Sequence, residues 1–278
     1  MRVRITILCE NSVGRAIPAI GEHGFSCWLE IDNKHYLFDT GQGLGIINNA
    51  QVLGLSLAKL SGVILSHGHY DHVGGLEQVL RHAGELEVFA HPEIFSERYS
   101  QSSRALRFIG IPQRRELLET LGARFTFTPE FQQVAPHLYV TGTIPRRNDF
   151  EVGDGNLVQR NVTGELEADP FHDDMAVVLD TPRGLVVVLG CAHSGMINTL
   201  DYVLEKFQRT EIYAVIGGTH LGPASAEQFE HTLTALERFN IQKLGVSHCT
   251  GQPRAAQLRS EFGKRFFYAS VGAVLEID

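Results

Sequence analysis

The segment "SHGHYDHVGG", residues 66–75, places three histidines and one aspartate within six consecutive positions. The preceding residues 60–66 are apolar and rich in branched side chains, which is typical of a buried strand. Residues 74–84 carry leucine and valine at helical spacing and end at a glycine, so they predict a helix. The cluster therefore lies in a strand-to-helix loop, where open α/β sheets usually place their chemistry.

The spacing of these side chains suits a pair of metal ions. His67 and His69 are two residues apart, so in extended backbone both point toward one place. Asp71 and His72 follow and face a neighbouring place. Imidazoles and a carboxylate are ligands of zinc, iron and manganese. The alternative is a solvated polar loop in which Asp71 caps the helix, but this density of ligand-type side chains favours a metal centre.

The composition is that of an ordinary enzyme. The chain has 278 residues, 43% hydrophobic and 20% charged, and a formal net charge of -8. Its length suits one large domain or two smaller ones. Basic residues are scattered rather than clustered, so we expect no nucleic-acid partner.

The N-terminus and the cysteines indicate the compartment. The first fourteen residues alternate like a strand and lack the features of a signal peptide. No window contains the roughly 18 apolar residues that span a bilayer, so we expect no membrane partner. The four cysteines show no CxxC spacing and fit a reducing compartment. We therefore expect a cytoplasmic protein.

Hydrophobic patterning predicts an alternation of strands and helices in two halves. Strands and helices that alternate in this way in two halves of the chain predict two sheets packed face to face with helices outside. Residues 147–170 are polar and contain glycine, which predicts a surface loop or lid. Strands are predicted at 2–9, 25–31, 34–41, 60–66, 123–131, 137–145, 212–218, 243–249 and 266–277, a strand pair at 175–190, a strand and short helix at 86–95, and helices at 45–54, 74–84, 113–124, 196–208, 225–239 and 253–263.

Three later histidines each follow a predicted buried strand and precede a glycine: His193, His220 and His248. If these strands lie in one sheet, their carboxyl ends bring the three loops toward the loop at 67–72. Asp39, in "LFDTG", also follows a strand. It either hydrogen-bonds a ligand imidazole and fixes its tautomer, or makes a turn before Gly41.

In sequence order, the motifs "LFDTG", "SHGHYDHVGG", "LGCAHSG", "GGTHL" and "SHCTG" resemble those of the metallo-β-lactamase fold superfamily. Further motifs at 22–26, 48–54, 141–146, 190–195 and 248–251 resemble the branch of 7,8-dihydropterin-6-methyl-4-(β-D-ribofuranosyl)aminobenzene 5'-phosphate synthase. The resemblance covers almost the whole chain. It implies a single domain over 1–278 with a four-layer αββα sandwich, an irregular insertion around 147–170, and metals at one edge of the paired sheets.

The resemblance also implies the ligands. His67, His69 and His193 would hold one metal ion, and Asp71, His72 and His248 the other. Many superfamily members have an aspartate bridging the metals where this chain has Cys191. Cys191 is either a bridging thiolate or a small buried thiol. Two divalent ions are implied, zinc in preference to manganese or iron, since a thiolate favours zinc.

Four residues are candidates for chemistry on the substrate. Asp71 could accept a proton from metal-bound water, and His220 could act as an acid toward a leaving group. His23 is a candidate contact at the mouth of the site. Arg146 could anchor an anionic phosphate through two hydrogen bonds, unless it is simply solvated.

Three functions follow. The first is a synthase-type transferase that joins a dihydropterin diphosphate to a ribofuranosylaminobenzene phosphate and releases pyrophosphate. The second is a dinuclear metallo-hydrolase of phosphoesters or other small esters. The third is a metal-binding or redox module such as a flavodiiron protein. Flavodiiron proteins typically carry Glu at a ligand position and a flavin domain, whereas position 69 is His and 278 residues leave no room for that domain.

Overall fold

The computed structural model describes residues 1–278 and contains two seven-stranded sheets and one four-stranded sheet. The first large sheet has the order β18-β1-β2-β3-β4-β5-β8, and the second has the order β17-β16-β15-β14-β13-β10-β9. In each, the strands are antiparallel at one end and parallel at the other. Both sheets are therefore mixed.

The first large sheet contains β1 (Val3–Cys9), β2 (Ser26–Ile31), β3 (Lys34–Phe38), β4 (Gly62–Ile64), β5 (Leu86–Ala90), β8 (Ala123–Phe127) and β18 (Val274–Ile277). The second contains β9 (Gln132–Ala135), β10 (Leu138–Val140), β13 (Ala176–Thr181), β14 (Gly184–Leu189), β15 (Ile212–Gly218), β16 (Lys243–Ser247) and β17 (Phe266–Tyr268). The helices are α1 (Ile46–Val52), α2 (Tyr70–Val73), α3 (Leu76–Ala83), α4 (Arg115–Thr120), α5 (Met196–Phe207), α6 (Ala226–Leu236) and α7 (Gln252–Phe262). Short 3-10 helices are η1 (Leu57–Lys59), η2 (Pro92–Phe95), η3 (Glu237–Phe239), η4 (His248–Thr250) and η5 (Gly263–Arg265).

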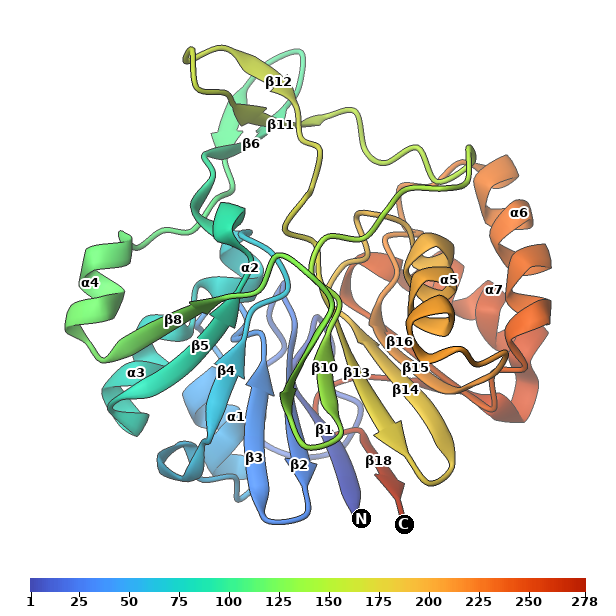
Figure 1. Cartoon of the computed structure of the whole chain (residues 1–278), viewed down its shortest axis with the longest axis horizontal. Helices are drawn as coiled ribbons and strands as arrows, with labels where there is room; N and C mark the ends of the chain where they lie inside the picture. The colour runs from blue at the N-terminus through green and yellow to red at the C-terminus, as the bar shows by residue number, and fades with distance from the viewer.

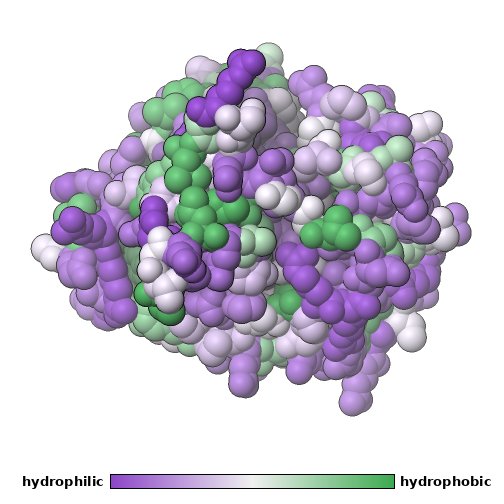
Figure 2. Space-filling view, turned by 90° about the horizontal axis from the view of Figure 1, so that it is seen from above, coloured by the Kyte–Doolittle hydropathy of each residue, from purple (hydrophilic) through white to green (hydrophobic).

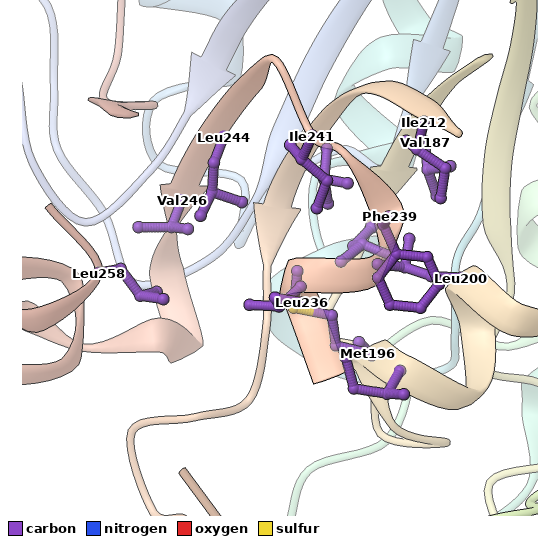
Figure 3. Close-up of a cluster of buried hydrophobic side chains, with 14 of the residues drawn as sticks. Val187, Met196, Leu200, Ile212, Leu236, Phe239, Ile241, Leu244, Val246 and Leu258 are labelled. Atoms are coloured by element: carbon purple, nitrogen blue, oxygen red, sulfur yellow. The ribbon is translucent and has the colours of Figure 1, made fainter. Parts of the chain in front are cut away.

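The two large sheets pack face to face, and helices cover their outer faces (Figure 1). Three hydrophobic cores separate the layers: one between the sheets, one under α1 and α3, and one under α5, α6 and α7. Figure 3 shows the third core, where Met196 and Leu200 of α5 lie near Leu236 and Phe239. The predicted αββα sandwich is confirmed.

Strand β14 shows how the sequence produces these layers. Its residues after Gly184 are all aliphatic and all buried, because both faces of the strand are covered. Val186 and Val188 point into the core between the sheets, whereas Leu185, Val187 and Leu189 pack under the helices. Each fully buried side chain of this kind stabilises the fold by roughly 1.5–3 kcal/mol.

The parallel halves of the two sheets deliver five loops to one edge of the sandwich. In the first sheet these loops follow β3 and β4, and they carry Asp39 and the cluster at 67–72. In the second sheet they follow β14, β15 and β16, and they carry His193, His220 and His248. The three later histidines thus share one sheet, but the cluster at 67–72 belongs to the facing sheet.

The prediction of one strand at 266–277 is wrong. The segment breaks into β17, which pairs with β16, and β18, which pairs with β1 in the other large sheet. The turn between them contains Gly272 at a φ of 84°, a conformation that glycine adopts without strain. The C-terminal strand therefore closes the first sheet beside the N-terminal one (Figure 1).

A small third sheet stands above the site edge of the sandwich (Figure 1). Its order is β12 (Leu166–Ala168), β11 (Leu157–Arg160), β6 (Arg98–Gln101) and β7 (Leu106–Phe108). Part of the segment 147–170, predicted as an irregular loop, is thus the β11–β12 hairpin. Residues 96–112, for which the sequence predicts no strand or helix, supply the other hairpin.

The face that carries the small sheet is mainly hydrophilic, with separate hydrophobic patches (Figure 2). Leu106, Phe108 and Leu166 of the small sheet are among the exposed large hydrophobic residues of the chain. None of the helices combines the length and the hydrophobicity needed to cross a lipid bilayer.

Candidate metal centre

The loop after β4 brings His67 and His69 together. His69 has extended backbone, with φ -94° and ψ 146°, so the two side chains point the same way. Nε2 of His67 lies 3.0 Å from Nδ1 of His69. Gly68 between them must be a glycine, because a Cβ there would overlap the carbonyl oxygen of Ile94. The Gly68 N–H donates to a carboxylate oxygen of Asp173 at 2.8 Å, which fixes the loop.

His193 completes the first cluster from the opposite sheet. The ligand atoms of His67, His69 and His193 all lie within 4.8 Å of one another, and the three residues are buried. The ring of Phe171 stacks on His193 at a centroid distance of 4.2 Å and an interplanar angle of 7°. Phe171 also meets His69 edge-on at 5.7 Å. The phenyl ring thus holds both imidazoles in their orientations.

Several nitrogens of these imidazoles have no hydrogen-bond partner in the protein: both ring nitrogens of His193 and Nε2 of His69. Buried polar atoms are nearly always paired, since leaving one unpaired costs roughly 1–3 kcal/mol. Burial, reinforced by the neighbouring imidazoles, lowers the pKa values of all three histidines of this cluster well below the usual value. Neutral imidazoles with free lone pairs are what a divalent metal ion requires.

The second cluster, Asp71, His72 and His248, is looser than the first: the ligand atoms of Asp71 and His248 lie within 4.8 Å of one another and of His23, whereas His72 is grouped in this way with His67 and Cys191. Nε2 of His248 lies 3.3 Å from Nε2 of His72 and 3.4 Å from Oδ2 of Asp71. Burial would raise the pKa of Asp71, but hydrogen bonds from His23 and His248 hold it well below its usual value. Asp71 is therefore an ionised carboxylate beside two imidazoles.

A hydrogen-bond network under both clusters fixes their tautomers. Oδ2 of Asp39 lies 2.6 Å from Nδ1 of His72, which leaves Nε2 of His72 facing the site. The Ser66 hydroxyl donates to the same carboxylate at 2.6 Å, and its oxygen lies 2.8 Å from Nδ1 of His67. Asp39 thus supports one histidine directly and a second one through Ser66.

Cys191 lies between the clusters. Its Sγ is 3.2 Å from Nε2 of His72, and it also lies within 4.8 Å of a ring nitrogen of His67 and of one of His193. Burial raises the pKa of the Cys191 thiol well above its ordinary value. Cys249 approaches from the loop after β16, where its Sγ accepts the N–H of His220 at 3.2 Å. Two sulfur atoms therefore border the centre.

His220 and His23 lie beside the clusters. The ring of His220 is 4.3 Å from that of His193, and neither of its nitrogens has a hydrogen-bond partner. Nε2 of His23 lies 3.1 Å from Oδ2 of Asp71, and its side chain is 56% exposed. Both histidines line a groove of about 170 Å³ over the clusters.

The predicted Arg146, like Arg98, is bound by other groups of the protein. Arg146 donates to the main-chain carbonyls of His193 at 2.9 Å and Glu151 at 3.2 Å, and it does not line the groove. Arg98 is fully buried between the carboxylates of Asp169 and Asp173. Arg146 therefore secures the loop that carries a site histidine, and its role as a phosphate anchor stays a prediction.

Several residues that were not predicted from the sequence hold the loops that carry His193 and His248. Asp174 accepts the N–H of Ser194 at 2.7 Å, and Glu10 accepts the N–H of His248 at 2.8 Å. Nδ1 of His248 lies 3.0 Å from Oδ1 of Asn11. Two adjacent aspartates, Asp173 and Asp174, just before the strand at 175 were the signal available in the sequence.

Strained backbone gathers at the same place. Nine non-glycine residues have a positive φ, and five of them border the centre: Asp39, Phe171, Ala192, His220 and His248. Such conformations cost of order 1–3 kcal/mol each and persist where surrounding structure enforces them, as at functional sites.

The sequence-family model of the metallo-beta-lactamase superfamily matches residues 20–248 of this chain. The chain belongs to the metallo-beta-lactamase superfamily. A curated relative from Methanocaldococcus jannaschii, 7,8-dihydropterin-6-methyl-4-(beta-D-ribofuranosyl)-aminobenzene-5'-phosphate synthase, is 27% identical over 283 residues, which cover 99% of this chain and 96% of the relative. An uncharacterized protein of the same organism is 29% identical and covers 98% of this chain and 100% of that one.

Solved structures of the superfamily show the same architecture. Tm1679, a metal-dependent hydrolase of the beta-lactamase superfamily, matches with a TM-score of 0.85 and 28% identity, covering 99% of both chains. A diphosphatase of the PhnP family shares the fold, with a TM-score of 0.59 and 11% identity, covering 99% of this chain and 98% of the other. The resemblance to this superfamily and to the synthase branch, inferred from the sequence, is confirmed.

Proposed function

We propose that this superfamily member is a dinuclear metal-dependent enzyme that acts on a small phosphate- or diphosphate-bearing metabolite. The observation that carries this proposal is the set of buried imidazole nitrogens of His69, His193 and His220 that no protein atom satisfies. A structural role would pair these nitrogens, whereas metal ligands and substrate contacts leave them free.

The proposed ligands are His67, His69 and His193 for one ion, and Asp71, His72 and His248 for the other. Cys191 is the proposed bridging group, because its sulfur lies close to residues of both clusters. Mixed imidazole, carboxylate and thiolate donors favour zinc over manganese or iron. When bound, such a pair of ions polarises a phosphoryl oxygen and lowers the pKa of bound water.

The proposed reaction is the synthase type. An aminobenzene nitrogen would displace the diphosphate from a dihydropterin, so that a carbon–nitrogen bond forms as a carbon–oxygen bond breaks. His220 is placed at the wall shared by the groove and an adjoining cavity of about 260 Å³, where it could donate a proton to the departing diphosphate. Asp71 and His23 also line the groove, with Nε2 of His23 3.1 Å from Oδ2 of Asp71, and could take up the proton that the nitrogen loses.

Hydrolysis is the second candidate, supported by the likeness to Tm1679. In that case the same groove would admit water and a phosphoester. The proton of the attacking water would pass to Asp71, whose depressed pKa makes it an ionised but weak base.

One assay separates the two reactions. The zinc-loaded protein is incubated with dihydropterin diphosphate, with and without ribofuranosylaminobenzene phosphate, and both the condensed pterin and free phosphate are measured. Condensed pterin with one equivalent of pyrophosphate supports the synthase, whereas free phosphate released from the dihydropterin diphosphate without condensation supports the hydrolase. Turnover that persists in a His67→Ala/His69→Ala variant, or the absence of both activities, contradicts the proposal.

A further inference from the structure

The small sheet presents one face to the metal centre. Arg107 of β7 pairs with Ser100 of β6, and Ser100 pairs with Leu157 of β11, so the three residues form a row across three strands. All three line the groove over the clusters, together with Ile109. The neighbouring residues in β6 and β7 point to the opposite face of the small sheet, where the ring centroids of Tyr99 and Phe108 lie 5.6 Å apart. The row therefore forms the roof of the groove.

Arg107 carries the only lysine or arginine charge in this groove. The guanidinium forms no ion pair and no hydrogen bond with the protein, in contrast with those of Arg98 and Arg146. The side chain is exposed, and its Cζ lies 5.6 Å from the ring centroid of Tyr70 in α2, beside the metal-site residues. The N–H of Tyr70 donates to the carbonyl of Ile109 at 2.9 Å, which ties this end of the roof to the metal-site loop.

We propose that Arg107 is the anion anchor of the substrate groove and that it binds a phosphate-type group lying between the small sheet and the metal centre. This inference rests on the proposed function and names the side chain that recognises the anion. Guanidinium matches two phosphate oxygens at once through a planar pair of N–H donors. Asp71 and Asp154 are the carboxylates of the same groove, so without a bound metal the groove holds two carboxylates against one guanidinium, that of Arg107.

Calorimetric binding of inorganic pyrophosphate to the zinc-loaded protein tests the proposal. Four proteins are compared at one ionic strength: wild type, Arg107→Gln, Arg107→Lys and Arg104→Gln. Arg104 lies in the turn of the same β6–β7 hairpin, is exposed and does not line the groove, so it controls for net charge. Metal content is measured before and after each titration, because pyrophosphate also chelates zinc.

Loss of a charge-assisted pair of hydrogen bonds predicts that Arg107→Gln weakens pyrophosphate binding about 10- to 100-fold at unchanged metal content. Arg107→Lys restores part of the affinity, because lysine keeps the charge without the planar donor pair. Arg104→Gln changes little, since its charge is screened by solvent and salt. Equal weakening by Arg104→Gln, unchanged binding by Arg107→Gln, or no binding by the wild type overturns the anchor.

Two further proteins, His67→Ala/His69→Ala and the same variant with Arg107→Gln added, separate this inference from the proposed function. Pyrophosphate binding that persists without the metal and is weakened by Arg107→Gln upholds the anchor and contradicts the proposed role of the metal ions in binding the anion. Conversely, binding that is lost with the metal but unaffected by Arg107→Gln upholds the metal site and rejects the anchor.

Discussion

Oδ2 of Asp39 and Nδ1 of His72 lie 2.6 Å apart, and both side chains are completely buried. They come from loops that follow neighbouring parallel strands, β3 and β4, of one sheet. The contact sets the tautomer of His72 and turns its Nε2 toward His248 and Cys191. Contacts of this kind fix ligand histidines and raise their basicity.

Asp39→Asn is therefore expected to weaken metal binding at the cluster that contains His72. Replacing such a partner typically lowers metal affinity about 10- to 100-fold. Zinc titration against a chromophoric chelator measures the two binding steps separately. One step should weaken while the other, at His67, His69 and His193, changes less. Two unaltered steps would show that Asp39 does not orient a ligand.

The stability of the metal-free protein should fall above neutral pH because of the same pair. Burial opposes the charge of His72, but the Asp39 carboxylate outweighs it and raises the pKa of His72 to about 9. A raised folded-state pKa gives stabilisation that is complete below the unfolded value of about 6.5 and is lost as the pH rises to about 9. The loss is at most about 3 kcal/mol. Urea unfolding in a chelator should show this decline in the wild type and not in Asp39→Asn.

Acid should destabilise the metal-free protein for the opposite reason. Burial and mutual repulsion lower the pKa values of His67, His69 and His193 well below the ordinary value. Their unfolded forms take up protons near pH 6.5, about the usual imidazole pKa, while the folded forms do not, so stability falls below that pH. In the same urea experiment, the free energy of unfolding of a His193→Phe variant should fall less steeply as the pH is lowered. An unchanged slope of the free energy of unfolding against pH would show that other groups take up the protons.

Cys191→Ser tests whether the thiol between the clusters binds metal. The cobalt-substituted protein should show a thiolate-to-cobalt charge-transfer band that Cys191→Ser removes, because the sulfur lies 3.2 Å from Nε2 of His72. Cys249→Ser is the matched control, as Cys249 also borders the centre. A spectrum without this band, or one that only Cys249→Ser alters, would make Cys191 a buried thiol with no metal bond.

Arg98→Met is expected to destabilise the fold strongly. The guanidinium is 1% exposed and holds Asp169 and Asp173, so its removal leaves two buried carboxylates unpaired. Breaking a buried pair in this way typically costs about 3–5 kcal/mol. Urea unfolding measures the change, with the exposed Arg160 of the same small sheet replaced by Met as the control. Similar midpoints for both variants would mean that the buried charges contribute little.

The sequence was most informative where function and local geometry coincide. The spacing of His67 and His69 predicted their convergence, because side chains two apart in extended backbone share a direction. Strand-end positions indicated His193 and His248 for a similar reason, since parallel strands bring their carboxyl ends to one edge. These signals depend only on local backbone and on sheet topology.

The rest depended on tertiary packing. Strands β6, β7, β11 and β12 have only three or four residues each; β7 and β12 are exposed and β6 and β11 are partly buried, so no hydrophobic alternation marked them. Phe171 supports His193 from the short stretch between the predicted loop at 147–170 and the predicted strand pair at 175–190, and no local pattern encodes that stacking. Arg107 was missed because the β6–β7 hairpin is placed over the site only through its pairing with β11, which is distant in sequence.

Metal content is the most direct measure of the central claim, that residues of two facing sheets hold a pair of cations. The purified protein is loaded with zinc, desalted and analysed for metal per folded chain, beside His67→Ala/His69→Ala checked for folding by circular dichroism. The account predicts two ions in the wild type and the loss of most of the bound metal in the folded variant. A folded wild type that retains no ion, or a variant that retains both, would contradict it.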